Sequence, residues 1–576
     1  MGIASIIVLG VAANWLAWRF RLPSILLLLI FGFVIGPITG FLHPEELLGD
    51  LLFPLVSLSL AFILYEGGLS LRLSEFREVG GVVLKLILIG VIVTWFIAIL
   101  GARLILGLSW PIAILLSAIL VVTGPTVIIP LLQEVRPKSD VRSTLKWEGI
   151  FIDPVGAVLA VLVFEAIVAG ELQQAPLLIA QGVLVTLVIG VVFGLLGAGL
   201  MIVLLKYFLV PDHLQNAMSM LLVVTTFTIS DLLHPEAGLL TVTIMGVVLA
   251  NQKLAPVKHI IEFKENLRVL LIAALFLLLA ARLQLDDIRL LGWGALAFLA
   301  VLVLIARPAA VFISAWGSNL SLKERLFLSW MAPRGIVAAA VASIFSVRLL
   351  EIGDAEGALL VPLTFFVITG TVLLYGLTAK PVAYWLGVAE ENPQGVLIMG
   401  AHALGRSMAE ALRNEGIKTM LIDTDWRNLS EARMLDIPTH YGSAIAEFAL
   451  DEIDFEGIGR FLALTSNDEA NALAILHFAE MFGRSEVYQL PITKEQRGHE
   501  RHRSALHLRG RTLFGETMTF PHLMEQFTNG AVVKATPLTQ EFDYKDYQAL
   551  HNGTAVPLFL VGADETLKIF TADNPP

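Results

Sequence analysis

The stretch that decides the fold is Glu148-Gly149-Ile150-Phe151-Ile152-Asp153-Pro154, in which two carboxylates stand within an apolar run. The segment around it, 147–169, is long enough to cross a bilayer, which takes about 20 apolar residues. Ionisable groups inside such a segment are costly and therefore indicate function. Five residues apart on a helix, Glu148 and Asp153 point about 140° away from each other and face different neighbours. The stretch predicts a membrane protein with two interior carboxylates of different roles.

Apolar residues dominate the chain up to about residue 387. Of the 576 residues, 56% are hydrophobic and 15% are charged, whereas soluble domains carry about 25% charged residues. Residues 2–18 lack a basic start and a small-residue cleavage site, so they are interpreted as a first transmembrane helix and not as a signal peptide. We predict a polytopic α-helical protein with about thirteen spans, at 2–18, 22–41, 51–69, 80–107, 111–133, 147–169, 176–206, 214–233, 236–250, 257–283, 290–315, 325–348 and 358–387.

Positive charge alternates between the predicted loops. The basic loops include Arg72 and Arg77, Lys138 and Arg142, and Lys323 and Arg325. The intervening loops, such as 43–46 and 351–354, are poor in Lys and Arg. Because basic loops face the cytosol, we expect the N-terminus outside, the C-terminal domain in the cytoplasm, and the chain in a cell (inner) membrane.

The composition also excludes several classes of function. The chain has no cysteine, which excludes disulfides, thiolate metal sites and a cysteine nucleophile. Its net charge of −11, without a strongly basic face, argues against nucleic acid as a partner. No catalytic set of residues is visible in the polar C-terminal part, so an enzyme is not expected.

Asp153 is the predicted ion-binding carboxylate. In a low-dielectric cavity, a carboxylate near neutral pH can hold a proton or a cation but not both, and this competition couples their movements. Arg307, within the predicted span 290–315, can neutralise Glu148 as a buried ion pair. The alternative is that Glu148 lies at the membrane surface and that Arg307 extends to the cytosol.

Two of the predicted spans are interrupted by proline and glycine. The interruptions are Thr123-Gly124-Pro125-Thr126 and Ala332-Pro333-Arg334-Gly335. Proline removes a backbone donor and glycine permits unwinding, and paired broken helices indicate a transporter with inverted repeats. Thr123 and Thr126 can offer hydroxyl oxygens to a dehydrated cation, and Arg334 can balance helix-end charge at the second break. Two ordinary proline kinks are the alternative interpretation.

This half of the chain resembles the sodium/proton exchanger branch of the cation/proton antiporter superfamily, the NhaP-like group. The matching stretches are 64–69, 123–125, 148–154, 304–307 and 334–335. The resemblance implies a homodimer that exchanges Na⁺ or K⁺ for protons by an elevator-like motion, in the service of pH homeostasis. It assigns Asp153 and Thr123 to the transported ion, and Glu148 with Arg307 to a structural pair.

The sequence departs from the family pattern at three positions. Gly124 stands where the family usually has Asp, Gly149 where it often has Ser, and Ile152 where it has Asn. Each change removes a polar group, and fewer oxygen ligands should weaken the binding of a small, strongly hydrated ion such as Na⁺. A preference for K⁺, or a mixed preference for Na⁺ and K⁺, therefore stays open.

From about residue 390 the sequence becomes that of a soluble α/β domain. Segments 395–399, 418–422 and 461–465 are predicted strands that alternate with helices, which implies a parallel, Rossmann-like sheet. From about residue 531 the pattern is typical of short strands, such as 532–534, separated by turns. We predict a transmembrane domain at 1–390, a nucleotide-binding domain at 394–515, and a small β-rich domain at 516–576.

A dinucleotide fingerprint opens this soluble part. Gly400 and Gly405 bracket the turn between the first strand and its helix, and Asp423 ends the next strand. His402 stands where the fingerprint has its middle glycine, and a side chain there obstructs the close approach of a pyrophosphate. His402 and Arg406 could instead contact a single phosphate. A βαβ fold that binds no nucleotide is the alternative.

The same region resembles the N-terminal lobe of potassium-transport regulator domains, called RCK or TrkA-N. The matching stretches are 400–405, 421–423, 441–444 and 464–471. The resemblance implies a regulatory nucleotide, AMP, ADP, ATP or NAD(H), and His402 favours a mononucleotide. On this basis the nucleotide site would also include Thr424, Ser443 and Thr465.

Two other functions compete with exchange. A cation channel or efflux system gated by the same domain would need a filter of exposed carbonyls, such as a Thr-Val-Gly-Tyr-Gly loop, and no such loop occurs in the sequence. A membrane oxidoreductase would need haem-type histidine pairs within the spans, and these are also lacking. Buried carboxylates suit exchange better than either alternative.

Overall fold

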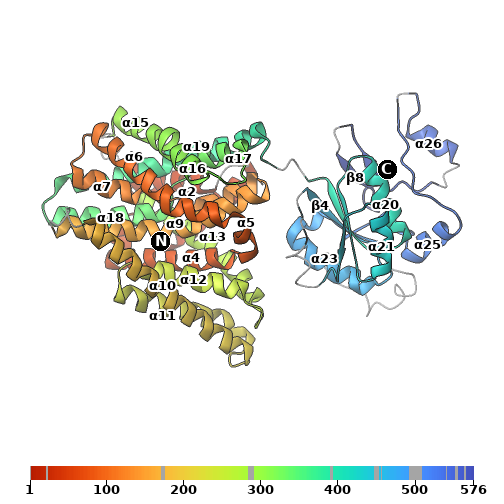
Figure 1. Cartoon of the computed structure of the whole chain (residues 1–576), viewed down its shortest axis with the longest axis horizontal. Coiled ribbons are helices and arrows are strands. Elements are labelled where there is room, and N and C mark those ends of the chain that lie inside the picture. Colours follow the sequence, from red (N-terminus) through yellow and green to blue (C-terminus); the bar gives the residue numbers. More distant parts are fainter. Residues whose placement is uncertain are drawn as a thin grey trace. The chain divides into compact units, whose positions relative to one another are not determined.

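The protein is described here from a computed structural model, which divides into two compact units, Met1–Ala389 and Glu390–Pro576 (Figure 1). The residues that the structure describes are 2–20, 24–135, 137–169, 175–282, 291–389, 393–445, 453, 455, 457–491, 509–539, 541–551, 555–563 and 566–575. The ends of several predicted segments, such as residues 22–23, 283 and 290, lie outside this set, as do residues 492–508 of the predicted nucleotide-binding domain.

The first unit is built of helices, because a helix satisfies its own backbone hydrogen bonds in hydrocarbon. In chain order they are α1 (Gly2–Phe20), α2 (Ser24–Phe33), α3 (Pro44–Leu48), α4 (Leu52–Leu69), α5 (Leu73–Lys85), α6 (Val91–Leu104), α7 (Trp110–Ile119), α8 (Pro125–Val135), α9 (Ser139–Val168), α10 (Ala175–Lys206), α11 (Asp212–Leu233), α12 (Ala237–Asn251), α13 (Lys258–Ala281), α15 (Trp293–Val301), α16 (Arg307–Ser314), α17 (Leu322–Trp330), α18 (Ile336–Glu351) and α19 (Leu360–Leu386). Three of the joins are single π-helical turns, Val34–Ile38, Leu86–Gly90 and Leu302–Ala306.

Long apolar helices make this unit a multi-pass membrane domain. Within the described residues, seven helical segments are long and apolar enough to cross a bilayer. They are Pro44–Leu69, Leu73–Leu104, Ser139–Val168, Gln181–Lys206, Asp212–Leu233, Trp293–Ser314 and Ala355–Leu386. Shorter apolar helices, including Trp110–Ile119 before the first interruption, account for further predicted ranges. The total of thirteen crossings stays a prediction.

Helix α9 lies in the middle of the bundle. In its most apolar 18-residue window, 78% of the residues are buried, against 28% for the corresponding windows of α10 and α11. Buried glycines allow this packing, because Gly156 and Gly149 face residues of the interrupted α7–α8 segment. The helix that carries Glu148 and Asp153 is therefore enclosed by protein, whereas α10 and α11 expose long apolar faces.

The second unit contains a six-stranded parallel sheet in the order β3-β2-β1-β4-β5-β6. Its strands are β1 (Gly395–Met399), β2 (Thr419–Asp423), β3 (Thr439–Tyr441), β4 (Ile458–Ala463), β5 (Val487–Gln489) and β6 (Arg511–Thr512). Its helices include α20 (Ala403–Asn414), α21 (Trp426–Met434) and α23 (Asp468–Phe482). The order reverses between β1 and β4, which makes this pair the topological switch point where doubly wound sheets bind ligands. The predicted parallel α/β sheet is confirmed.

The description of the C-terminal tail as β-rich is wrong. Beyond residue 515 the described residues form α25 (Phe520–Thr528), α26 (Tyr544–Leu550) and one antiparallel hairpin, β7 (Phe559–Val561) with β8 (Leu567–Ile569). The predicted strand 532–534 is not paired, and the Val532 side chain is 78% exposed. A short β-branched run becomes a strand only where a neighbouring strand accepts its hydrogen bonds. Leu523 and Leu567 pack into the core that contains β1, and the boundary at residue 516 stays a prediction.

Candidate functional site

Two interrupted helices cross at their breaks. The first is α7–α8, broken at 120–124, and the second is α17–α18, broken at 331–335. The Gly124 amide donates to the Pro333 carbonyl at 3.0 Å. A Cβ added to Gly124 would overlap the Cα of Gly335, and one added to Gly335 would overlap the Cα of Gly124. Glycine at both positions thus permits backbone-to-backbone contact between segments far apart in the sequence.

Gly124→Ala is expected to destabilise the membrane unit, because neither backbone at the crossing can move away cheaply. Overpacking a buried site costs about 1–3 kcal/mol and sometimes more, and we expect the upper end of that range together with loss of transport. Gly81→Ala is the control, because Gly81 lies in helix α5 with nothing within 4 Å of an added Cβ. Thermal unfolding of the purified variants measures the difference, and equal behaviour of the two variants would contradict this geometry.

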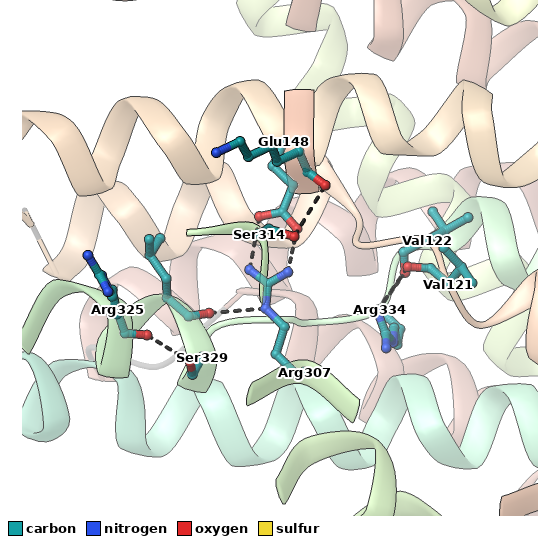
Figure 2. A network of polar contacts seen from close by, with 10 residues as sticks. Val121, Val122, Glu148, Arg307, Ser314, Arg325, Ser329 and Arg334 are labelled. Carbon is teal, nitrogen blue, oxygen red and sulfur yellow. Dashed lines mark hydrogen bonds and ion pairs between the residues drawn. The ribbon is translucent and has the colours of Figure 1, made fainter. Parts of the chain in front are cut away.

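Arg334 joins the two breaks electrostatically. Its side chain is 2% exposed, and its guanidinium donates to the carbonyls of Val121 at 3.1 Å and Val122 at 3.4 Å (Figure 2). These carbonyls follow the end of α7, where a helix carries partial negative charge. The Arg334 amide also contacts the Thr371 hydroxyl of α19 at 3.2 Å. Arg334, which lies in the second break, therefore compensates the C-terminal end of α7 at the first break, whereas the sequence had placed its helix-end role at the second break.

Asp153 faces the first break. Gly149, Asp153 and Gly156 lie on one side of α9, since they are four and three residues apart. A Cβ on Gly149 would meet Pro125, and one on Gly156 would meet Val122. The Asp153 side chain, between these two glycines and 2% exposed, is thus placed against the unwound segment that carries Thr123.

Three buried oxygen atoms near this break lack hydrogen bonds. They are Asp153 Oδ1, Thr123 Oγ1 and Thr126 Oγ1, for which the described residues offer no partner. Leaving a buried polar atom unpaired costs about 1–3 kcal/mol, so each such atom calls for an explanation. A carboxylate with two hydroxyls is an oxygen set suited to a cation that has lost part of its hydration shell.

Glu148 takes a different partner, as its separation from Asp153 on the helix implies. Both of its carboxylate oxygens accept from the Arg307 guanidinium, and the Arg307 Nε donates to the Leu328 carbonyl at 3.0 Å (Figure 2). Glu148 is 1% exposed and Arg307 5%. The π-helical turn Leu302–Ala306 directly precedes Arg307, and such turns often lie at functional sites. This ion pair ties α9 to α16 and α17.

The nucleotide fingerprint has an unusual geometry in the second unit. Gly400 has φ +114°, and a side chain on Gly405 would overlap the Gly400 carbonyl, so both positions require glycine. His402 caps helix α20, with its Nδ1 accepting from the Gly405 amide at 3.3 Å. The ring proton then lies on Nε2, which donates to the Leu464 carbonyl at 2.7 Å. Burial lowers the pKa of His402 and favours this neutral ring.

The remaining predicted nucleotide residues line the ends of the neighbouring strands. Asp423 Oδ2 accepts from the Ala401 amide at 2.8 Å, so it is tied to the fingerprint loop. The Arg406 guanidinium donates to the Ala401 carbonyl and forms an ion pair with Glu431, so these contacts hold the fingerprint loop. Thr424 follows β2 and Ser443 follows β3, on the same half of the sheet.

Thr465 lies on the other half of the sheet, after β4. Its hydroxyl donates to the Asn471 carboxamide oxygen at 2.7 Å, and its amide contacts the same oxygen at 3.3 Å. Thr465 therefore shapes the turn into α23. A contact between Thr465 and a nucleotide stays a prediction.

Comparison with known proteins decides the family. Residues 3–385 match the family described as sodium/hydrogen exchanger, transmembrane. The chain belongs to the sodium/hydrogen exchanger family. In this exchanger, residues 396–497 also match the TrkA-N domain, which agrees with the parallel sheet of the second unit.

Several relatives of the exchanger have assigned names. Na(+)/H(+) antiporter 1 of Methanocaldococcus jannaschii is 29% identical over 360 residues, covering 60% of this chain and 83% of that protein. The K(+)/H(+) antiporter NhaP of Alkalimonas amylolytica is 28% identical over 408 residues, covering 68% of this chain and 67% of that protein. The solved structure of the sodium proton antiporter MjNhaP1 from Methanocaldococcus jannaschii at pH 8 aligns with a TM-score of 0.57 at 25% identity, over 66% of this chain and 97% of that chain.

The exchanger has a second set of intramembrane charges, which reasoning from the sequence missed. Glu66 and Arg268 form an ion pair at 2.9 Å beside a small cavity that Thr126 also lines. Lys264, one turn before Arg268, is 1% exposed, and its Nζ lies 5.1 Å from the ring centroids of both Phe62 and Tyr65. The signal was present, because charges within predicted spans indicate function. Glu66 lies near the end of the predicted span 51–69, whereas Lys264 and Arg268 lie well inside the predicted span 257–283.

Proposed function

We propose that this protein exchanges a monovalent cation, Na⁺ or K⁺, for protons across a cell membrane. The observation that carries the proposal is the set of three buried oxygens without hydrogen bonds, from Asp153, Thr123 and Thr126, beside two crossed broken helices. The names of the relatives support the same reaction with either ion.

The proposed mechanism rests on competition for one carboxylate. Asp153 binds either the cation, together with the Thr123 and Thr126 oxygens, or a proton. Arg334 balances the carbonyls of the first break, so the loaded site has no unpaired helix-end charge next to it. Glu148 is already paired with Arg307, which leaves Asp153 as the other buried carboxylate of α9 and the one that can exchange a proton for a cation.

Packing explains part of the departure from the family pattern. Gly124 is in backbone contact with Gly335, and Gly149 packs against Pro125 and Ile128. Ile152 is 3% exposed and belongs to the main apolar core. These positions supply close contact instead of oxygen ligands, which supports a site open to K⁺ as well as Na⁺.

The remaining features of the proposal concern topology, assembly and control. We propose a homodimer in the inner membrane, with the N-terminus outside and the second unit in the cytoplasm. The TrkA-N match and the fingerprint geometry support regulation by a nucleotide bound at the β1–α20 turn. The alternation of basic and acidic loops supports the orientation.

The test uses everted membrane vesicles with an interior that has been acidified and a pH-sensitive dye. Addition of Na⁺ or K⁺ should alkalinise the lumen, and a panel of Li⁺, Na⁺, K⁺ and Rb⁺ gives the selectivity. Vesicles without the protein are the control. Proton movement that no cation of the panel raises above this control would refute exchange, and cation uptake without any proton movement would instead indicate a channel.

A further inference from the structure

The His402 side chain crosses the crevice where a doubly wound sheet holds a dinucleotide. His402 ends the turn between β1 and α20, whereas Leu464 directly follows β4. The 2.7 Å hydrogen bond from His402 Nε2 to the Leu464 carbonyl therefore spans the β1–β4 switch point. A dinucleotide lies across this point, with one nucleoside on each half of the sheet. In this chain an imidazole ring occupies the passage between the two halves.

A residue of the tail braces the ring from another side. Phe520, the first residue of α25, lies edge-on to His402 with the ring centroids 5.1 Å apart and an interplanar angle of 81°. The other ring nitrogen of His402 holds the Gly405 amide. The ring is thus fixed by a helix cap, a strand-end carbonyl and an aromatic contact, and moving it would break all three.

The half of the site beside β2 has the groups that bind one nucleotide, an acceptor for a ribose hydroxyl and donors for a phosphate. Asp423 accepts three hydrogen bonds, from the Ala401 amide, the Asp425 amide and the Asn428 side chain, at 2.8 to 3.1 Å. An ionised carboxylate has about four acceptor positions, so one remains for a ribose hydroxyl. The first amides of a helix have no carbonyl partner within it; His402 takes that of Gly405, and those of Ala403 and Leu404 can hold one phosphate.

We infer that the second unit binds a nucleoside monophosphate on the β1–β2 half of its sheet and excludes dinucleotides, because His402 bars the crevice between β1 and β4. The inference rests on the regulatory part of the proposed function, and it narrows the ligand to one class. It assigns His402 as a specificity residue and Phe520 as its brace.

The test measures binding of AMP and of NADH to the purified full-length protein by titration calorimetry. Wild type should bind AMP at least about tenfold more tightly than NADH, a difference of about 1.4 kcal/mol. His402→Ser keeps a helix-capping hydroxyl but is too short to reach Leu464, so the affinity for NADH relative to that for AMP should rise by at least about tenfold. His402→Gln, which keeps the bulk, should leave NADH excluded.

A second variant guards against an effect on folding. Phe520→Ala leaves the fingerprint intact and removes the brace, so it should raise NADH affinity in the same direction by a smaller factor. The inference would be overturned if wild type bound NADH as tightly as AMP or bound neither ligand. It would also be overturned if His402→Ser gained no affinity for NADH. Cation/proton exchange is measured on the same preparations, so that the two proposals can fail separately. Exchange without the preference for AMP over NADH would refute only this inference. The preference for AMP without exchange would refute only the proposed transport.

Discussion

Asp153→Asn should abolish cation-dependent proton movement. The substitution keeps the size of the side chain and one carbonyl oxygen but removes the charge and the titrating group. Without a carboxylate at this position, the site loses both the attraction for a cation and the carrier of the proton. In everted vesicles the response of the dye to Na⁺ and K⁺ should fall to that of vesicles without the protein.

The matched control is Asp212→Asn, an acidic residue in the first turn of α11 that is exposed. This variant should keep transport close to wild type, which shows that loss of one negative charge is not itself the cause. The unfolding temperature of Asp153→Asn should match or exceed that of wild type, because a neutral amide replaces a buried carboxyl group whose Oδ1 has no hydrogen-bond partner among the described residues. Full activity of the folded Asp153→Asn variant would refute the site assignment.

Arg307→Gln should have the largest effect on stability. The substitution leaves the Glu148 carboxylate, 1% exposed, without its ionic partner. Removing one partner of a buried pair costs about 3–5 kcal/mol, because the remaining charge is uncompensated. The arginine also donates to the Leu328 carbonyl, so the contact between α16 and α17 weakens at the same time. A large fall in the thermal unfolding temperature in detergent is the expected result.

A double-mutant cycle tests whether the loss comes from the pair. Glu148→Gln combined with Arg307→Gln should be less destabilised than the sum of the two single variants, since neither charge is left alone. Glu45→Gln provides the surface comparison, because Glu45 pairs with Arg282 at 2.8 Å while its side chain is 70% exposed. That change should stay within about 1 kcal/mol. Additive losses in the cycle would show that Glu148 and Arg307 act independently.

The sequence and the structure agree most closely where the signals are local. The predicted strand 395–399 matches β1, and the helix predicted after its glycine turn is α20. Both are fixed by short-range features, an apolar run followed by a glycine turn and then an amphipathic helix. The strand predicted at 461–465 is instead Ile458–Ala463, because residues 464–465 leave the sheet to form the turn into α23. Boundaries depend on such competition between neighbours.

The charged residues Glu66, Lys264 and Arg268 form an interior cluster that was not predicted from the local sequence. Glu66 lies near the end of a predicted apolar segment, where a charged side chain is ordinarily solvated, whereas Lys264 and Arg268 lie well inside another such segment. The structure encloses them between α4 and α13, next to the cavity that Thr126 lines. Only the packing of the two helices turns these positions into an interior cluster.

The sequence alone determined that Glu148 and Asp153 lie inside a membrane domain, that two spans are broken by proline and glycine, and that a parallel α/β domain follows. These properties depend on the cost of placing charge and unpaired backbone in hydrocarbon, and on the periodicity of apolar residues, both of which are encoded locally. The tertiary structure decided that Gly124 meets Gly335, that Arg334 holds Val121, and that the ring of His402 reaches Leu464. Close contacts and hydrogen-bond partners between distant segments depend on how whole elements pack. For this reason the stretch around Asp153 predicted an ion-binding site, but only the folded chain showed the oxygen atoms that could complete it.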